Sequence, residues 1–169
     1  MGMKMKTKDK NFTIRFAKED DVGIILRFIR ELAEYEDLLD QVVATEEVLY
    51  DALFRRRSAE VIIGEYNNEP IGFALFFHNF STFLGQAGIY LEDLYIRPDM
   101  RGKGLGKIMI SFLGKVAKER GCGRLEWWCL DWNESSINFY KNLGAVAMDE
   151  WTVYRISGED LDNLAKDEE

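Results

Sequence analysis

The sequence contains few of the residues that metal and redox centres need. It has one histidine, His78, and only two cysteines, Cys122 and Cys129, which lack the close pairing of a zinc site. We therefore expect no metal, and we expect both thiols to be reduced in a cytoplasmic protein. A lone histidine at the end of an apolar run is more often structural than catalytic, so His78 receives no role.

Long apolar runs and an excess of positive charge are also missing. No run approaches the roughly 18 residues that indicate a membrane span, and no apolar segment follows the lysine-rich start, as a secretory signal would require. The net charge of −8 argues against a nucleic-acid partner. An acidic surface suits a cationic substrate, although it also serves solubility alone.

The chain is otherwise that of an ordinary soluble globular protein, with 169 residues of which 47% are hydrophobic. We expect one domain over residues 1–169. Apolar patterns predict strands over 12–17, 59–66, 71–77, 90–96, 124–130 and 151–156. Helical spacing predicts helices that begin near 18, 46, 105 and 135, with another turn or two in 159–166. This order predicts an α/β fold with a mixed sheet and helices on both faces.

Residues 90–120 are predicted to form a strand, a glycine-rich loop and a helix. The apolar stripe of the helix consists of Leu105, Ile108, Met109, Phe112, Leu113, Val116 and Ala117. Gly102, Gly104 and Gly106 let the backbone approach a ligand closely, and the helix N-terminus attracts anions. The loop and first turn also carry positive charge from Arg101, Lys103 and Lys107. A pyrophosphate is the expected ligand.

The spacing of this loop excludes two other nucleotide motifs. Gly102, Gly104 and Gly106 form Gly-x-Gly-x-Gly, whereas a dinucleotide fingerprint requires Gly-x-Gly-x-x-Gly. A phosphate-binding Walker loop would need glycine in place of Arg101 and serine or threonine in place of Ile108. On spacing alone, a glycine-rich turn without a ligand stays an open alternative.

Two features beside the loop offer acid–base chemistry. Glu92 and Asp93 lie in an otherwise apolar strand, and a buried carboxylate with a raised pKa is a useful base. A surface edge strand is the alternative, although Leu91, Leu94 and Ile96 favour a buried one. Tyr140 follows Ser136 by one turn in a short helix that Asn133 or Ser135 can cap. A half-buried aromatic without a role is the alternative for Tyr140.

Taken together, the chain resembles the Gcn5-related N-acetyltransferase (GNAT) superfamily, whose Arg/Gln-x-x-Gly-x-Gly/Ala motif is matched by Arg101, Gly104 and Gly106. It is most similar to the diamine branch of spermidine/spermine and thialysine N-acetyltransferases. The strings that carry this resemblance are 29–36, 90–95, 131–133, 137–141 and 143–145.

The resemblance implies acetyl-coenzyme A as cofactor, with coenzyme A as product and no metal. The coenzyme would lie where the strand carrying Glu92 splays from strand 124–130. The residues implied to bind it are Leu94, Tyr95, Ile96, Arg101, Gly102, Lys103, Gly104, Leu105, Gly106, Lys107, Asn133 and Ser136. The family's general acid is matched by Tyr140, and Glu92 matches the residue that binds the amine and helps remove its proton.

The implied reaction is acetyl transfer to a primary amine of a small cationic substrate, by direct attack in a ternary complex. Glu92 and Asp93 would hold the positive charge. Departures from the spermidine/spermine pattern place Arg27 and Phe28 on the first helix, where Arg27 would repel a polyamine or bind the carboxylate of a lysine analogue. Asp149 is the candidate for an acidic substrate residue near the end of the chain.

Two alternatives remain open, one for the activity and one for the substrate. A non-catalytic coenzyme A-binding module on the same fold needs neither Glu92 nor Tyr140. An acetyltransferase that acts on protein amines is compatible with an acidic chain. The resemblance also implies a homodimer, with the C-terminal strands at its interface.

Overall fold

The computed structural model describes residues 4–6 and 9–166, in two compact units that comprise residues 1–128 and 129–169. The strands are β1 Lys4–Lys6, β2 Phe12–Phe16, β3 Glu60–Tyr66, β4 Glu69–Ser81, β5 Gln86–Ile96 and β6 Leu125–Trp127. The α-helices are α1 Val22–Tyr35, α2 Glu46–Tyr50, α3 Leu105–Glu119, α4 Glu134–Asn142 and α5 Glu159–Leu164. Short 3₁₀ turns η1 Glu19–Asp21, η2 Leu39–Gln41 and η4 Pro98–Met100 and a π-helical turn η3 Asp51–Arg55 complete the elements.

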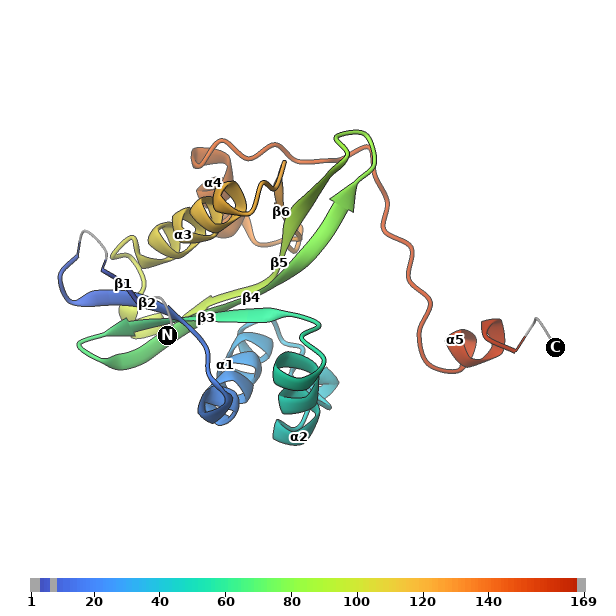
Figure 1. The fold of residues 1–169 in the computed structure, drawn as a ribbon, viewed down its shortest axis with the longest axis horizontal. Coiled ribbons are helices and arrows are strands. Elements are labelled where there is room, and N and C mark those ends of the chain that lie inside the picture. Colours follow the sequence, from blue (N-terminus) through green and yellow to red (C-terminus); the bar gives the residue numbers. More distant parts are fainter. Residues whose placement is uncertain (1–3, 7–8, 167–169) are drawn as a thin grey trace. The chain divides into compact units, whose positions relative to one another are not determined.

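The strands of the first unit form one mixed sheet in the order β1-β2-β3-β4-β5-β6. Neighbouring strands are antiparallel from β1 to β5, and only β5 and β6 run parallel. Within this unit, α1 and α2 cover one face of the sheet and α3 covers the other (Figure 1). The mixed α/β fold predicted from the sequence is confirmed.

Each face of the sheet buries its own layer of apolar side chains. Towards α1, Phe28 stacks on Phe73 with ring centroids 5.8 Å apart, in a cluster with Ile25, Leu53, Val61, Ile63 and Tyr95. Towards α3, Phe112 packs edge-on against Phe16 at 6.0 Å. Full burial of such side chains stabilises the fold by about 1.5–3 kcal/mol each, so the two layers fix the helices on the sheet.

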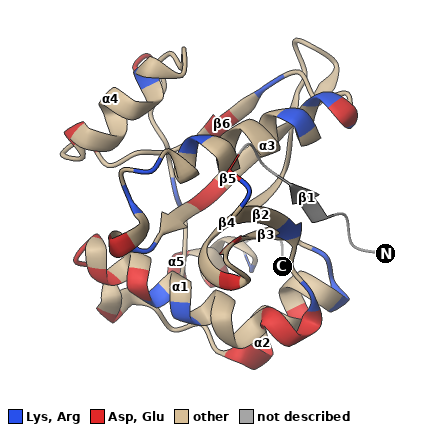
Figure 2. Ribbon diagram, turned by 90° about the vertical axis from the view of Figure 1, so that its left-hand side faces the viewer, with Lys and Arg blue, Asp and Glu red and all other residues tan. Residues whose placement is uncertain are grey.

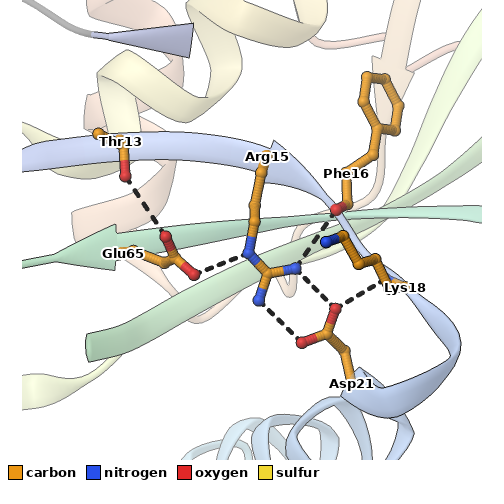
Figure 3. Close-up of polar contacts among 6 residues, drawn as sticks. All are labelled: Thr13, Arg15, Phe16, Lys18, Asp21 and Glu65. Carbon is orange, nitrogen blue, oxygen red and sulfur yellow. Dashed lines mark hydrogen bonds and ion pairs between the residues drawn. The ribbon is translucent and has the colours of Figure 1, made fainter. Parts of the chain in front are cut away.

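A polar network ties the start of α1 to the sheet (Figure 3). The Arg15 guanidinium donates to both carboxylate oxygens of Asp21, at 2.6 and 2.8 Å, and its Nε donates to Glu65 at 2.7 Å. Thr13 donates to the other oxygen of Glu65 at 3.5 Å. Burial acts to raise the pKa of Asp21, but the hydrogen bonds from Arg15 and the Lys18 N–H, together with the charges of Arg15 and Lys18, lower that pKa overall. The network therefore anchors η1 and α1 to β2 and β3.

Several predicted boundaries change in the structure. The strand predicted over 151–156 is wrong, because these residues form no regular element and pair with no strand in the described part of the chain. The strand predicted over 124–130 contracts to β6, whereas β4 and β5 extend to Ser81 and Gln86 and leave only a four-residue turn. The Thr45 cap is confirmed, since its side chain accepts from the Val48 N–H at 3.3 Å. None of the described helices is long and apolar enough to cross a membrane.

Candidate functional site

Glu92 is the extra residue of a β-bulge in the middle of β5. Leu75 of β4 pairs with Asp93 and the next residue, Phe76, pairs with Leu91, so Glu92 has no partner on β4. Its side chain is exposed although the strand around it is largely buried. Bulges commonly re-aim side chains beside functional sites, and this one turns a carboxylate outward from the centre of the sheet.

Asp93 lies next to the bulge in a group of three carboxylates with Glu92 and Glu36, the residue after α1. Burial, followed by repulsion from Glu92 and Glu36, raises the pKa of Asp93 to about 6. Burial also raises the pKa of Glu36. Acidic residues lie in the middle of β5 and on α2, and α1 carries both acidic and basic residues (Figure 2). Such a group can hold a cation or accept a proton near neutral pH.

The helix α1 contributes less to this group than the sequence suggested. Phe28 is completely buried against Phe73 and Tyr95, so its ring has no surface for a ligand. Arg27 makes an ion pair with Glu31 at 3.5 Å and lies over the Phe28 ring. Tyr95 is also buried, and its burial and a hydrogen bond with Glu31 raise its pKa to about 12. These residues serve packing and helix-surface charge.

The backbone of Leu94, Tyr95 and Ile96 lies beyond the end of the parallel ladder between β5 and β6. That ladder comprises the pairs from Ile89–Leu125 to Leu91–Trp127, and in the described residues it goes no further. From Glu92 onward, the edge of β5 on this side is therefore not paired with β6. A bound amide chain would find backbone donors and acceptors on such an edge.

The loop before α3 fits a diphosphate. Gly102 and Gly104 have φ of 76° and 75°, and a Cβ built at either position would meet no atom within 4 Å. The first hydrogen bond of α3 runs from the Ile108 N–H to the Gly104 carbonyl at 3.2 Å. The N–H groups of Leu105, Gly106 and Lys107 thus have no acceptor within the helix, and the helix dipole favours an anion there.

Positive side chains surround this loop in different ways. Arg101 donates through Nε to the Ile96 carbonyl at 2.9 Å, and its guanidinium lies 4.6 Å from the centre of the Tyr35 ring. The Lys103 ammonium lies 5.5 Å from the Tyr66 ring, and Lys107 is exposed. Arg101 therefore connects the end of β5 with the end of α1. These two elements also carry the carboxylate group, since Glu92 and Asp93 lie in β5 and Glu36 follows α1.

The second unit carries the remaining candidate residues. Asn133 caps α4 by accepting from the Ser136 N–H at 3.2 Å. Tyr140 is half-buried in α4, with its ring centre 5.3 Å from that of Phe139. Asp149 is exposed in the segment after the helix. Within this unit, Asn133, Ser136 and Tyr140 therefore share one short helix.

Within residues 1–128, the structure brings Glu92, Asp93, the edge of β5 and the glycine loop into one continuous region. It adds Glu36, which the sequence analysis did not select. Glu36 lies at the end of the string 29–36, whose resemblance to the diamine acetyltransferases was noted without assigning a role to that residue. Its raised pKa and its repulsion of Asp93 are the observations that identify it.

Comparison with known proteins agrees with this geometry. The model of the Acetyltransferase (GNAT) family matches residues 26–145. Thialysine N-epsilon-acetyltransferase of Bos taurus is 40% identical over 164 residues, which cover 90% of this chain and 96% of that protein. L-ornithine N5-acetyltransferase of Arabidopsis thaliana is 31% identical over 199 residues, with 90% and 87% covered.

Solved structures show the same fold. An integron cassette protein from the mobile metagenome of V. cholerae aligns with a TM-score of 0.76 and 29% identity, over 92% of this chain and 98% of that chain. A ribosomal-protein-alanine N-acetyltransferase from Brucella melitensis aligns with a TM-score of 0.69 at 21% identity, over 87% and 99%. The second likeness, at this identity, concerns the fold alone.

Proposed function

Because the chain belongs to the GNAT family of acetyltransferases and is thus an acyltransferase, we propose that it transfers an acetyl group from acetyl-CoA to a small primary amine. The proposed acceptor is a diamine, a polyamine or a lysine analogue such as thialysine. The relative from Bos taurus is named for thialysine and is 40% identical, which supports the last of these. The observation that carries the proposal is the carboxylate group around Asp93.

The carboxylates supply what an amine acceptor needs. An alkylammonium ion is not a nucleophile, so it must lose a proton to a nearby base before it can attack. Asp93, whose pKa is raised to about 6, remains able to accept a proton just below neutral pH. Glu92, which the bulge turns outward, binds the ammonium and takes or relays its proton. Glu36 adds a third negative charge for a second amino group.

GNAT acetyltransferases use acetyl-CoA, which supplies the acetyl group as an activated thioester. We assign its diphosphate to the N–H groups at the start of α3 and its amide chain to the backbone of 94–96. Gly102, Gly104 and the exposed Lys107 support the first assignment, because they leave open space and positive charge at a helix N-terminus. Asn133 and Ser136 are proposed to line the coenzyme, and Tyr140 is proposed to donate a proton from its hydroxyl to the leaving thiolate.

Coenzyme A release over a panel of acceptors tests this function. The panel contains spermidine, putrescine, lysine and thialysine, with a lysine-bearing peptide to detect transfer to proteins. We expect release with at least one small amine, and release with the peptide alone would contradict the proposed substrate class. No release with any acceptor, despite coenzyme binding, would indicate a binding module.

Tyr140→Phe tests the proton donor in the same assay. The substitution keeps the ring and removes the hydroxyl, so we expect turnover to fall by about 10²- to 10⁴-fold, as for loss of a general acid. Tyr50→Phe is the control, because it makes the same change on α2, outside the proposed site and the proposed dimer contact. An unchanged turnover number in Tyr140→Phe would refute the role.

We also propose a cytoplasmic homodimer. Cys122 and Cys129 form no disulfide in the described residues, which fits a reducing compartment. The segment after α4 exposes a series of large apolar side chains, namely Val146, Met148, Trp151, Val153, Tyr154 and Ile156. Exposed apolar series of this kind usually contact another chain, and a second copy is the partner we propose. Light scattering after size exclusion would reveal a monomer if this is wrong.

A further inference from the structure

A cavity of about 510 Å³ lies where β2 leaves the sheet and β3 enters it. Its apolar walls come from Phe16, Ala17, Leu53, Phe54, Ala59 and Val61, and its charged walls from Glu19, Arg57 and Glu60. The volume is typical of pockets that bind small molecules. None of the lining residues belongs to the carboxylate group or to the glycine loop, so the cavity is separate from the site proposed above.

Both acidic side chains of the cavity already have partners. Glu19 accepts a hydrogen bond from the Tyr50 hydroxyl at 2.9 Å. Glu60 accepts from Nη1 and Nη2 of Arg120, the latter at 2.9 Å, and these bonds lower the pKa of Glu60. Because Arg120 compensates Glu60, the cavity is less acidic than its two carboxylates suggest.

Arg57 is the cationic side chain of the cavity, and it lacks such a partner. Its neighbours Arg55 and Arg56 both make ion pairs with Asp51, at 3.9 and 2.5 Å. For Arg57 the structure contains no hydrogen bond or ion pair with any described residue. A guanidinium on the wall of a cavity that is in part apolar is thus available to an anion.

The backbone of Arg57 is also unusual. Its φ is +54°, and the other non-glycine residues with positive φ in the described chain are Asp37, Asn67 and Asn68. Asparagine and aspartate tolerate positive φ because their short polar side chains can bond to the local backbone, but arginine has no such compensation. The position follows the helical turn η3, and the Ser58 N–H closes that turn onto the Ala52 carbonyl at 2.9 Å. Glycine is the usual residue at such a helix end, so Arg57 occupies this position at a backbone cost.

We propose that this cavity binds a small organic carboxylate with an apolar body. The carboxylate pairs with Arg57, since guanidinium and carboxylate match in charge and geometry. The apolar body lies against Phe16, Leu53 and Phe54, which supply the hydrophobic contact. The proposal does not depend on the acetyltransferase function, because it involves a different set of residues.

The test uses the full chain and two probes of the same shape, 3-phenylpropanoate and the neutral 3-phenylpropan-1-ol. Amide NMR spectra should show shifts at Ala17 and Ala59 on addition of the acid, with a dissociation constant on the order of 1 mM. The alcohol should bind at least about tenfold more weakly, because it lacks the charge that pairs with Arg57.

Arg57→Gly separates binding from folding. Glycine adopts the positive φ freely, so this variant should keep or raise the melting temperature while it loses at least about tenfold in affinity for the acid. Arg56→Gln is the matched control, because Arg56 pairs with Asp51 and does not line the cavity. Equal binding of acid and alcohol, undiminished binding by Arg57→Gly, or no shifts at Ala17 and Ala59 up to about 20 mM acid would each overturn the proposal.

Discussion

The ionised Asp93 side chain should lower the free energy of unfolding, because it is buried beside two other carboxylates. Its pKa is about 6 in the folded chain, because of burial and of the neighbouring Glu92 and Glu36, and about 3.9 when unfolded. Between these two values the unfolded chain releases the proton while the folded chain retains it. Stability therefore falls as the pH rises from about 4 to about 6 and then levels off.

The size of this effect follows from the two pKa values. One pKa unit corresponds to 1.36 kcal/mol, so the difference amounts to about 3 kcal/mol at neutral pH, as an upper value. Asp93→Asn removes the charge and keeps the shape of the side chain. We expect the variant to be about 2–3 kcal/mol more stable at pH 7.5, which for a chain of this size raises the melting temperature by roughly 4–12 °C.

Urea unfolding followed by circular dichroism at pH 7.5, 6, 5 and 4 measures the effect. The advantage of Asp93→Asn should shrink with falling pH and disappear near pH 4. Asp20→Asn, which makes the same change at an exposed position, is the control and should show no such trend. Asp93→Asn should also lose at least about tenfold in kcat/KM for the amine. A variant that is less stable than the parent at pH 7.5 would refute the reasoning.

Three further outcomes follow from the structure. Arg15→Met leaves Asp21 and Glu65 without their shared cation, and we expect it to lower the free energy of unfolding in urea by about 2–4 kcal/mol. Arg27→Met is the control, because it removes one exposed ion pair and should lower the free energy of unfolding by under about 1 kcal/mol. Gly72→Ala would bring a Cβ to 2.3 Å from the Tyr95 carbonyl oxygen; we expect a loss of at least about 2 kcal/mol and weaker coenzyme A binding by calorimetry, because β5 must move. Glu36→Gln removes a charge that raises the pKa of Asp93. The acidic limb of the pH–rate profile should therefore move to lower pH, and KM for a diamine should rise several-fold. A pH–rate profile identical to that of the parent would exclude Glu36 from the site.

The helices and central strands were predictable because their signals are local. The stripe from Leu105 to Ala117 is set by the helical period, and all of its residues except the half-buried Ile108 are buried in α3. The side-chain cap at Thr45 likewise depends on residues three apart. Gly102 and Gly104 adopt positive φ in the loop, as glycine readily does, whereas Gly106 lies in the first turn of α3.

The features that escaped prediction depend on distant residues. The bulge at Glu92 is visible only in the register of β5 against β4. The raised pKa of Asp93 comes first from burial in the folded chain, then from Glu92 and from Glu36, which is more than fifty residues away in the chain. The strand predicted over 151–156 failed because alternation of apolar residues indicates a strand only if an edge is available to pair with it. Arg27 and Phe28 were placed by resemblance, whereas the period of α1 directs Phe28 into the core.

The single extra residue in β5 also determines which deletions this strand can accept during evolution. Asp93 pairs with Leu75 and Leu91 pairs with Phe76, so the pairs on either side of Glu92 use consecutive residues of β4. Deleting Glu92 would therefore keep every pair and both faces of β5, and would remove only the bulge and its carboxylate. Deleting a paired residue of β5 would instead exchange inside and outside for the part of the strand beyond it. Homologues that have no use for the carboxylate can therefore have a β5 that is one residue shorter at this position.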